Sequence, residues 1–284
     1  MKFSTKFWLI TATLLVIFGS IITFGAILYS GGNFDKISST KYQTNTFNVS
    51  ESFNSISVDL STADLEFVVS ETNECKVECF EQRNLTHSAA VLNGVLNIGN
   101  TDNRTWRDHF GFNFKSSKVK VYLPSGEYQN VTINSSTGEV NICQGFTFNS
   151  LKITLTTGNV KVKDATVNEE LFISVTTGDV EIKNVTAKKI TSKGSTGETY
   201  LNNVVAVEHI TIERTTGDVE FSDIDAHELF FKTTTGDIEG SILSEKKFDA
   251  KTSTGKKVVP STLNGGDCVL QTSTGDIRVS IKNA

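Results

Sequence analysis

The sequence predicts an all-β protein, a single-stranded β-helix (β-solenoid) of about 20-residue coils with an irregular N-terminal β cap, preceded by one transmembrane helix. Three observations predict this fold. A Thr-Gly turn occurs eight times at spacings of 19 or 20 residues, apolar residues alternate on both sides of each turn, and a segment of 23 uncharged residues, 7–29, lies near the N-terminus. Such a period combined with alternating strands is typical of solenoids.

The uncharged segment 7–29 is long enough to cross a membrane as a helix. Its 23 residues would extend roughly 34 Å, and a bilayer core is about 30 Å thick. The alternative is a cleaved signal peptide, whose apolar region usually covers about 7–15 residues and ends in a small-x-small site. Segment 7–29 is longer and has no clear A-x-A site, which favours an uncleaved anchor in the lipid bilayer.

Two lysines before this segment predict how the chain is oriented. Lys2 and Lys6 precede it, so the positive-inside rule places the N-terminus in the cytoplasm and the C-terminal domain outside a single-pass cell-membrane protein. We expect a cytoplasmic N-terminus at 1–6, a transmembrane helix at 7–29, a linker at 30–45, a β cap region at 46–130 and regular solenoid repeats at 131–284. The exported part has 25 basic and 32 acidic residues, which argues against nucleic acid as a partner.

The eight turns share Thr followed by Gly, and in most copies an acidic or amide residue comes next. They are Thr137-Gly138, Thr157-Gly158, Thr177-Gly178, Thr196-Gly197, Thr216-Gly217, Thr235-Gly236, Thr254-Gly255 and Thr274-Gly275. An array of hairpins would show the same local alternation, but hairpin turns prefer Asn-Gly or Asp-Gly. An unvaried Thr is expected where stacked coils form a ladder, held by methyl packing and hydroxyl bonds. We therefore favour the solenoid, with glycine supplying a positive φ at each corner.

The region before the regular array contains a ninth, degenerate copy. In ISVDLSTADLEF, residues 56–67, Ala63 replaces the glycine. Between this copy and the array, the stretches KVECF, VLNGVLNI and KVKVYLP have the alternation of strands. We interpret them as strands of the irregular cap.

Together, the repeat spacing, the degenerate copy, the VYLPSG segment and the [ST]-T-G-[DEN]-[VI] turns resemble a bacterial putative-adhesin family of unknown function. It includes LiaG-like membrane-anchored envelope proteins, and the resemblance covers roughly residues 50–282. The resemblance implies a single-stranded β-helix outside the membrane and supplies no catalytic residues. The chain departs from the pattern at Lys256-Lys257, where a basic pair replaces acidic and apolar residues. It also departs at Gly194, which stands where Leu155 and Val175 stand in earlier coils.

Residues 104–114, RTWRDHFGFNF, concentrate aromatic and basic side chains in the cap region. Trp and Phe can stack on sugar rings or enter the membrane interface. Candidate ligand contacts are therefore Arg104, Trp106, Arg107, Phe110 and Phe112. The alternative is that this segment closes the open end of the solenoid, with alternate aromatic residues facing inward.

One repeat position, directly after the glycine, carries acidic residues in four successive turns. Asp179, Glu198, Asp218 and Asp237 could form a stripe that binds calcium through carboxylate oxygens. The alternative is that each carboxylate caps its own turn. Asn159 and Lys256 break the stripe, and the nine-residue repeat of calcium-binding β-helices is absent. We expect no metal at these corners.

Cysteines and histidines give no indication of a metal centre or a cofactor. Cys75 and Cys79 lie on one predicted strand about 13 Å apart, too far for a disulfide, and Cys268 occupies an inward repeat position. The histidines are scattered, whereas zinc sites need close spacing. We predict no metal site and no cofactor.

The leading interpretation of function is non-enzymatic. We expect a cell-envelope binding, adhesin-like or scaffolding module whose partner is a cell-wall polymer or a membrane protein. The alternatives are a regulatory envelope-stress component that acts through a membrane protein partner, and a carbohydrate-active β-helix enzyme. An enzyme needs a converging acid, base or nucleophile, and no G-x-S-x-G, H-E-x-x-H or Walker sequence is present.

Overall fold

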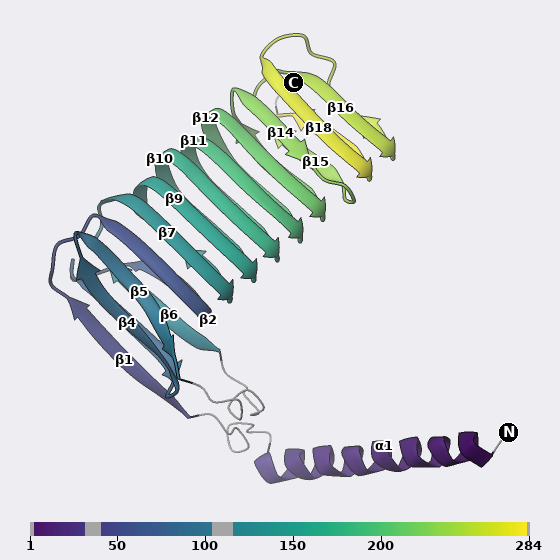
Figure 1. The fold of residues 1–284 in the computed structure, drawn as a ribbon. Coiled ribbons are helices and arrows are strands. Elements are labelled where there is room, and N and C mark those ends of the chain that lie inside the picture. Colours follow the sequence, from purple (N-terminus) through teal and green to yellow (C-terminus); the bar gives the residue numbers. More distant parts are fainter. Residues whose placement is uncertain (1–2, 32–40, 104–115, 283–284) are drawn as a thin grey trace.

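The computed structural model describes residues 3–31, 41–103 and 116–282. One helix, α1 (Phe3–Ser30), precedes nineteen strands that form a single sheet wound into a rod (Figure 1). The strands are β1 (Tyr42–Val49), β2 (Ser55–Val69), β3 (Cys75–Gln82), β4 (Leu85–Leu92), β5 (Val95–Asp102), β6 (Ser117–Leu123), β7 (Glu127–Thr137), β8 (Val140–Ile142), β9 (Phe146–Thr157), β10 (Val160–Thr177), β11 (Val180–Thr196), β12 (Thr199–Thr216), β13 (Val219–Asp225), β14 (Glu228–Lys232), β15 (Ile238–Ile242), β16 (Lys246–Thr254), β17 (Lys257–Val258), β18 (Gly266–Thr274) and β19 (Ile277–Ile281).

Helix α1 stands apart from the buried core. Its window Thr5–Tyr29 is long and apolar enough to cross a membrane, and none of it is buried against the rest of the protein. Its Thr and Ser hydroxyls, such as those of Thr11 and Ser20, donate to the carbonyl oxygen four residues earlier, so these polar groups need no water. Because the core contains no residue of α1, we expect residues 41–284 to fold without it.

Successive coils of the rod pair in parallel and in register. Thr137 lies opposite Thr157, Thr157 opposite Thr177, and Thr177 opposite Thr196. The solenoid is therefore confirmed over the hairpin array. The ladder at this corner is held by the backbone rather than by threonine hydroxyls, since the amide of Gly158 donates to the carbonyl of Thr177 over 2.9 Å and the other coils repeat this bond.

Each coil has three straight runs whose inward side chains fill the core. In one coil the buried residues are Leu171, Ile173, Val175, then Val180, Ile182, then Val185, Ala187. The Thr-Gly corner separates the first two runs, and a register shift after Ala187 marks the third corner. At the second corner Asn184 has a φ of 52°, as do Asp164 and Asn203. Asn and Asp tolerate this left-handed conformation better than other non-glycine residues.

The N-terminal end of the rod is closed by a mixed sheet. Strand β2 is the degenerate copy and forms the first coil, paired on one side with β7 and β8 and on the other with β5 and β6. Strand β3 then pairs antiparallel with β6, β1 with β3, and β4 with β5. The three stretches interpreted as cap strands lie in β3, in β4 with β5, and in β6.

At the opposite end, the order of coils in space differs from their order in the sequence. Strands β14 and β15 pair with β18 and β19, and β16 and β17 lie outside that last coil (Figure 1). Lys257 explains this arrangement, because it stands in register with Ile277 at an inward position. Between two coils its ammonium group would be buried without a partner, which is costly. In the outermost coil Lys257 remains exposed.

Candidate functional site

The predicted contacts Arg104, Trp106, Arg107, Phe110 and Phe112 lie outside the described residues. Strands β5 and β6, which precede and follow them, both pair with β2 at the closed end of the rod. The choice between ligand contact and cap therefore stays a prediction.

The acidic residues of the Thr-Gly corners cap the neighbouring coil rather than their own turn. Asp179 Oδ1 accepts the amide of Glu198 at 2.9 Å, and Asp218 Oδ1 accepts the amide of Asp237 at 2.7 Å. Asn159 Oδ1 does the same for Asp179 at 2.9 Å. Each of these side chains thus satisfies a backbone donor of the next coil, which gives the residue after the glycine a structural role.

The spatial order also corrects the interruption expected at Lys256. Asp276 lies next to Asp237, and its Oδ1 accepts the amide of Lys256, which comes last. Five acidic corners are therefore contiguous, from Asp179 to Asp276. The Asp oxygens that face along the stripe are already engaged by amides, so this stripe gives no support for a calcium site.

Glu198 is the acidic corner residue that we expect to contribute least to stability. Its partial burial, then the charges of Asp179, Asp218 and Glu220, raise the pKa of its carboxyl group. Within the described part of the chain, its longer side chain makes no bond to the amide of Asp218. Glu198→Asn should stabilise the protein at pH 7 by about 0.5–1.5 kcal/mol, since it removes repulsion and adds a hydrogen bond like that of Asn159.

Urea unfolding at pH 7 and pH 4 measures this gain, with Glu198→Gln as the variant that removes charge alone. A raised pKa means that the ionised carboxylate costs stability above the pKa and not below it. The contribution from charge should therefore shrink at low pH in both variants. A destabilised Glu198→Asn protein would contradict the capping role of the corner residue.

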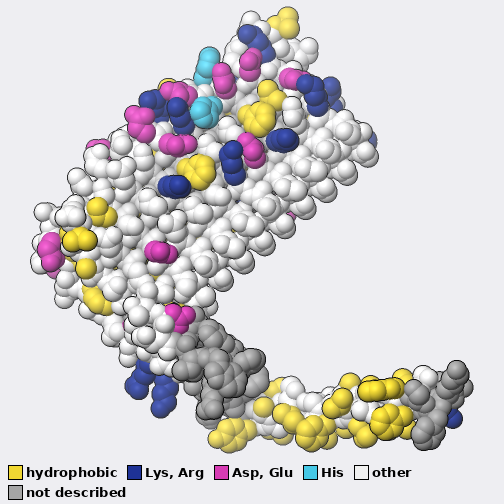
Figure 2. All heavy atoms as spheres, viewed as in Figure 1, with side chains coloured by type: hydrophobic (Ala, Val, Ile, Leu, Met, Phe, Trp, Pro, Cys, Tyr) yellow, Lys and Arg dark blue, Asp and Glu magenta, His cyan; other side chains and the backbone are white. Residues whose placement is uncertain are grey.

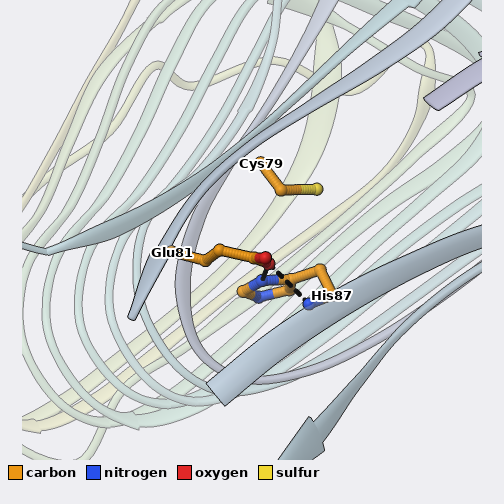
Figure 3. A group of neighbouring side chains, drawn as sticks. All are labelled: Cys79, Glu81 and His87. Carbon is orange, nitrogen blue, oxygen red and sulfur yellow. Dashed lines mark hydrogen bonds and ion pairs between the residues drawn. The ribbon is translucent and has the colours of Figure 1, made fainter. Parts of the chain in front are cut away.

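A buried polar cluster lies in the cap, where β3 and β4 place Cys79, Glu81 and His87 side by side (Figure 3). Glu81 is fully buried, and its Oε2 accepts the amide of His87 at 2.5 Å and lies 2.8 Å from His87 Nδ1. Its Oε1 accepts Asn45 Nδ2 at 2.5 Å. The sequence did not indicate this cluster, because His87 lies on a different strand from Cys79 and Glu81. The one available signal was Glu81, since a glutamate is unusual at an inward strand position.

The donor set of this cluster matches that of zinc sites, with sulfur, nitrogen and oxygen atoms within 4.8 Å of one another. However, both Glu81 oxygens already accept hydrogen bonds. Burial, with a smaller effect of the Glu81 charge, raises the pKa of the Cys79 thiol to about 12, so the thiol stays protonated. The contacts favour a satisfied hydrogen-bond network that joins β1, β3 and β4.

A second buried charge accounts for the departure at Gly194. Arg214 is 4% exposed and donates to Thr199 Oγ1 at 2.8 Å and to Ser192 Oγ at 3.3 Å. A Cβ at Gly194 would lie 1.7 Å from Arg214 Nη1. The absence of a side chain at 194 therefore makes room for the guanidinium group inside the rod. Burial lowers the pKa of Arg214 to about 10.

One face of the rod carries an aromatic side chain between two hollows. Strand register aligns an outward row of Lys161, Glu181, Tyr200, Glu220, Glu239 and Arg278. Tyr200 and Asn202 line both hollows, one of about 410 Å³ toward Lys161 and one of about 520 Å³ toward Arg278. We call this row the Tyr200 row.

Carboxylates and an arginine do meet on this face, as a carbohydrate-active site would require. Arg278 forms ion pairs with Glu239 and Asp276. Arg278 is exposed, Glu239 and Asp276 are half-buried, and both carboxylates pair with the same guanidinium group. Within the described residues this group therefore supplies no separate acid and base. This arrangement suits hydrogen bonding to a ligand better than proton transfer.

The fold thus defines a β-solenoid domain behind a helix that is able to span a membrane. The chain belongs to the Toastrack family DUF4097, whose model matches residues 53–189 and 165–284. The resemblance found in the sequence is confirmed. No protein with curated annotation matches the chain.

Several solved structures are similar to this chain at low sequence identity. A putative adhesin from Bacteroides fragilis has a TM-score of 0.40 and 14% identity, with 86% of this chain and 99% of that chain covered. A putative lipid binding protein from Parabacteroides distasonis has a TM-score of 0.40 and 15% identity, covering 86% and 97%. A putative cell adhesion protein from Clostridium sporogenes has a TM-score of 0.28 and 9% identity, covering 86% and 100%.

Proposed function

We propose that this protein is a non-enzymatic, membrane-anchored binding module that holds a cell-wall glycan along the Tyr200 row. The observation that supports this function is the pair of hollows that share Tyr200 and Asn202. A phenol ring offers an apolar face and a polar tip to a sugar ring. The carboxylate, amide and guanidinium groups beside it can accept and donate hydrogen bonds to hydroxyl groups.

The shape of the rod supports a polymer rather than a small ligand. The two hollows follow the row across successive coils, from Asn159 at one end to Arg278 at the other. Repeat solenoids present extended surfaces of this kind for long partners. With α1 as a single membrane span and the N-terminus in the cytoplasm, the domain would stand outside the cell membrane, where wall polymer is found.

The experiment is co-sedimentation of purified residues 41–284 with cell-wall sacculi and, in parallel, with liposomes. We expect saturable binding to sacculi that Tyr200→Ala weakens about three- to tenfold, as loss of one aromatic contact predicts. Phe172→Ala is the matched control, because Phe172 is an outward aromatic residue in a different run of its coil. Trp106→Ala tests the aromatic segment separately.

Absence of binding to sacculi would contradict the proposed function, and so would equal losses for Tyr200→Ala and Phe172→Ala. Binding to liposomes alone would indicate a lipid surface as the partner. Exchange of α1 for an unrelated anchor should leave wall binding unchanged. If the exchange abolishes the protein's effect in cells while wall binding persists, the regulatory alternative through a membrane protein gains support.

A further inference from the structure

The rod ends in a coil whose charge differs from that of the rest of the chain. We call residues 246–258, which form β16 and β17, the end coil. It contains five lysines and one acidic residue, whereas the whole chain has 27 basic and 32 acidic residues. Within the described part of the chain, its strands pair only with β18 and β19, so its outer edge is open.

Two lysines of the end coil have no partner for their ammonium groups among the described residues. Lys246 is buried and pairs with Asp225 at 2.7 Å, and Lys251 pairs with Asp249 at 2.7 Å. Lys257 Nζ donates to the carbonyl of Ala250 at 3.2 Å. Lys247 and Lys256 are exposed, and neither ammonium group forms an ion pair or hydrogen bond in the described structure.

Most lysines along the body of the rod are arranged differently. Lys161 pairs with Glu139 at 2.8 Å and Lys163 with Glu181 at 2.8 Å. Lys189 and Lys193 also pair with glutamates of the neighbouring coil, at 3.2 Å in both cases. Basic and acidic side chains are mixed on the face of the rod that Figure 2 shows. The end coil differs in its composition, with five lysines against one acidic residue.

Protection of the open edge explains only part of this charge. Lysines at a strand edge discourage pairing with another chain, and here Lys257 and Thr262 bond to the carbonyls of Ala250 and Lys246. The ammonium groups of Lys247 and Lys256 form no hydrogen bond to the backbone of the edge in the described structure. Their charge therefore has no structural use within the described residues.

We propose that the end coil binds a linear polymer that carries repeated phosphate groups. Lysine ammonium groups are effective point charges for phosphate oxygens. The acidic excess of the rest of the chain repels a polyanion, so binding is confined to the end of the rod. The end coil lies at the end of the rod opposite the cap (Figure 1). This ligand differs from the glycan proposed for the Tyr200 row, and the inference does not depend on that row.

The test measures binding of inorganic polyphosphate to residues 41–284 by calorimetry at two salt concentrations. Lys247→Gln/Lys256→Gln should weaken binding about fivefold and lower the slope of log affinity against log salt by about 1–2. Lys183→Gln/Lys232→Gln is the matched control, because it removes the same charge from exposed lysines of the body. The control should change affinity less than about twofold, as expected for screened distant charges.

Failure of the wild-type protein to bind polyphosphate would overturn the inference, and so would equal losses in the two double variants. Equal affinity for poly-glutamate would also overturn it, since the end coil would then bind any polyanion without preference for phosphate groups. If the Lys247→Gln/Lys256→Gln variant self-associates in light scattering but keeps its affinity for polyphosphate, the two lysines only protect the edge and the inference is wrong. Sacculus binding through Tyr200 is a separate readout, so either proposal can fail alone.

Discussion

Replacing Gly178 by alanine is expected to lower the free energy of unfolding by about 3–5 kcal/mol. Gly178 has a φ of 138°, which L side chains rarely adopt, and an added Cβ would lie 2.1 Å from the carbonyl oxygen of Gly158. The neighbouring coil must therefore move away. That movement also disturbs the hydrogen bond from the amide of Gly178 to the carbonyl of Thr196.

Urea unfolding of residues 41–284 measures this loss. Gly126→Ala is the control, because no atom lies within 4 Å of a Cβ added there and its φ is not positive. It should change stability by less than about 0.5 kcal/mol. Equal unfolding midpoints for the two variants would show that the close approach of backbones at the corner does not affect the free energy of unfolding.

The same corner shows why so much of the fold could be predicted from the sequence. Thr and Gly recur because each coil places its corner on the one before it, and identical surroundings select identical residues. Thr177, for example, lies opposite Thr157 and Thr196. Period-two alternation then fixes which side chains face inward. Local patterns therefore determine a fold whose contacts repeat from coil to coil.

Features that depend on one particular coil could not be predicted in this way. Lys257 stands at an inward position, and it stays exposed because its coil is the outermost one. The order of coils at the end of the rod therefore follows from burial in space and not from the order of repeats in the sequence. The second corner carries Asp164, Asn184, Asn203 and Asp223 at one repeat position. The sequence shows this regularity, but it did not predict a corner because Asn and Asp residues are also common on any polar surface.

Contacts between distant inward residues were the least predictable part of the candidate sites. Gly194 departs from the repeat because Arg214 of the next coil occupies its space. Neither residue alone indicates the other. The cap follows the same rule, because Asn45 and Glu81 come together only when β1 and β3 pair.

The buried pair of Glu81 and His87 provides the second large effect. His87→Leu removes the ring that lies 2.8 Å from Glu81 Oε2 and leaves a fully buried carboxylate with fewer donors. The loss of one partner of a buried, hydrogen-bonded pair of this kind costs about 3–5 kcal/mol. Glu81→Met/His87→Leu removes both partners and restores apolar packing, so it should be less destabilised than His87→Leu by about 2 kcal/mol. Urea unfolding of the single and double variants gives this coupling.

Thermal unfolding with added zinc separates a hydrogen-bond network from a metal site at Cys79, Glu81 and His87. A metal that binds only the folded protein stabilises it by RT ln(1 + [M]/Kd), so the melting temperature rises with the logarithm of the metal concentration once that concentration exceeds the dissociation constant. Zinc would have to displace the donors on the Glu81 oxygens and the proton of the Cys79 thiol, whose pKa burial raises. We therefore expect zinc to leave the melting temperature of the wild type unchanged. A zinc-dependent rise that Cys79→Ser abolishes would contradict the network and establish the metal site, since serine removes the sulfur ligand without disturbing Glu81 and His87.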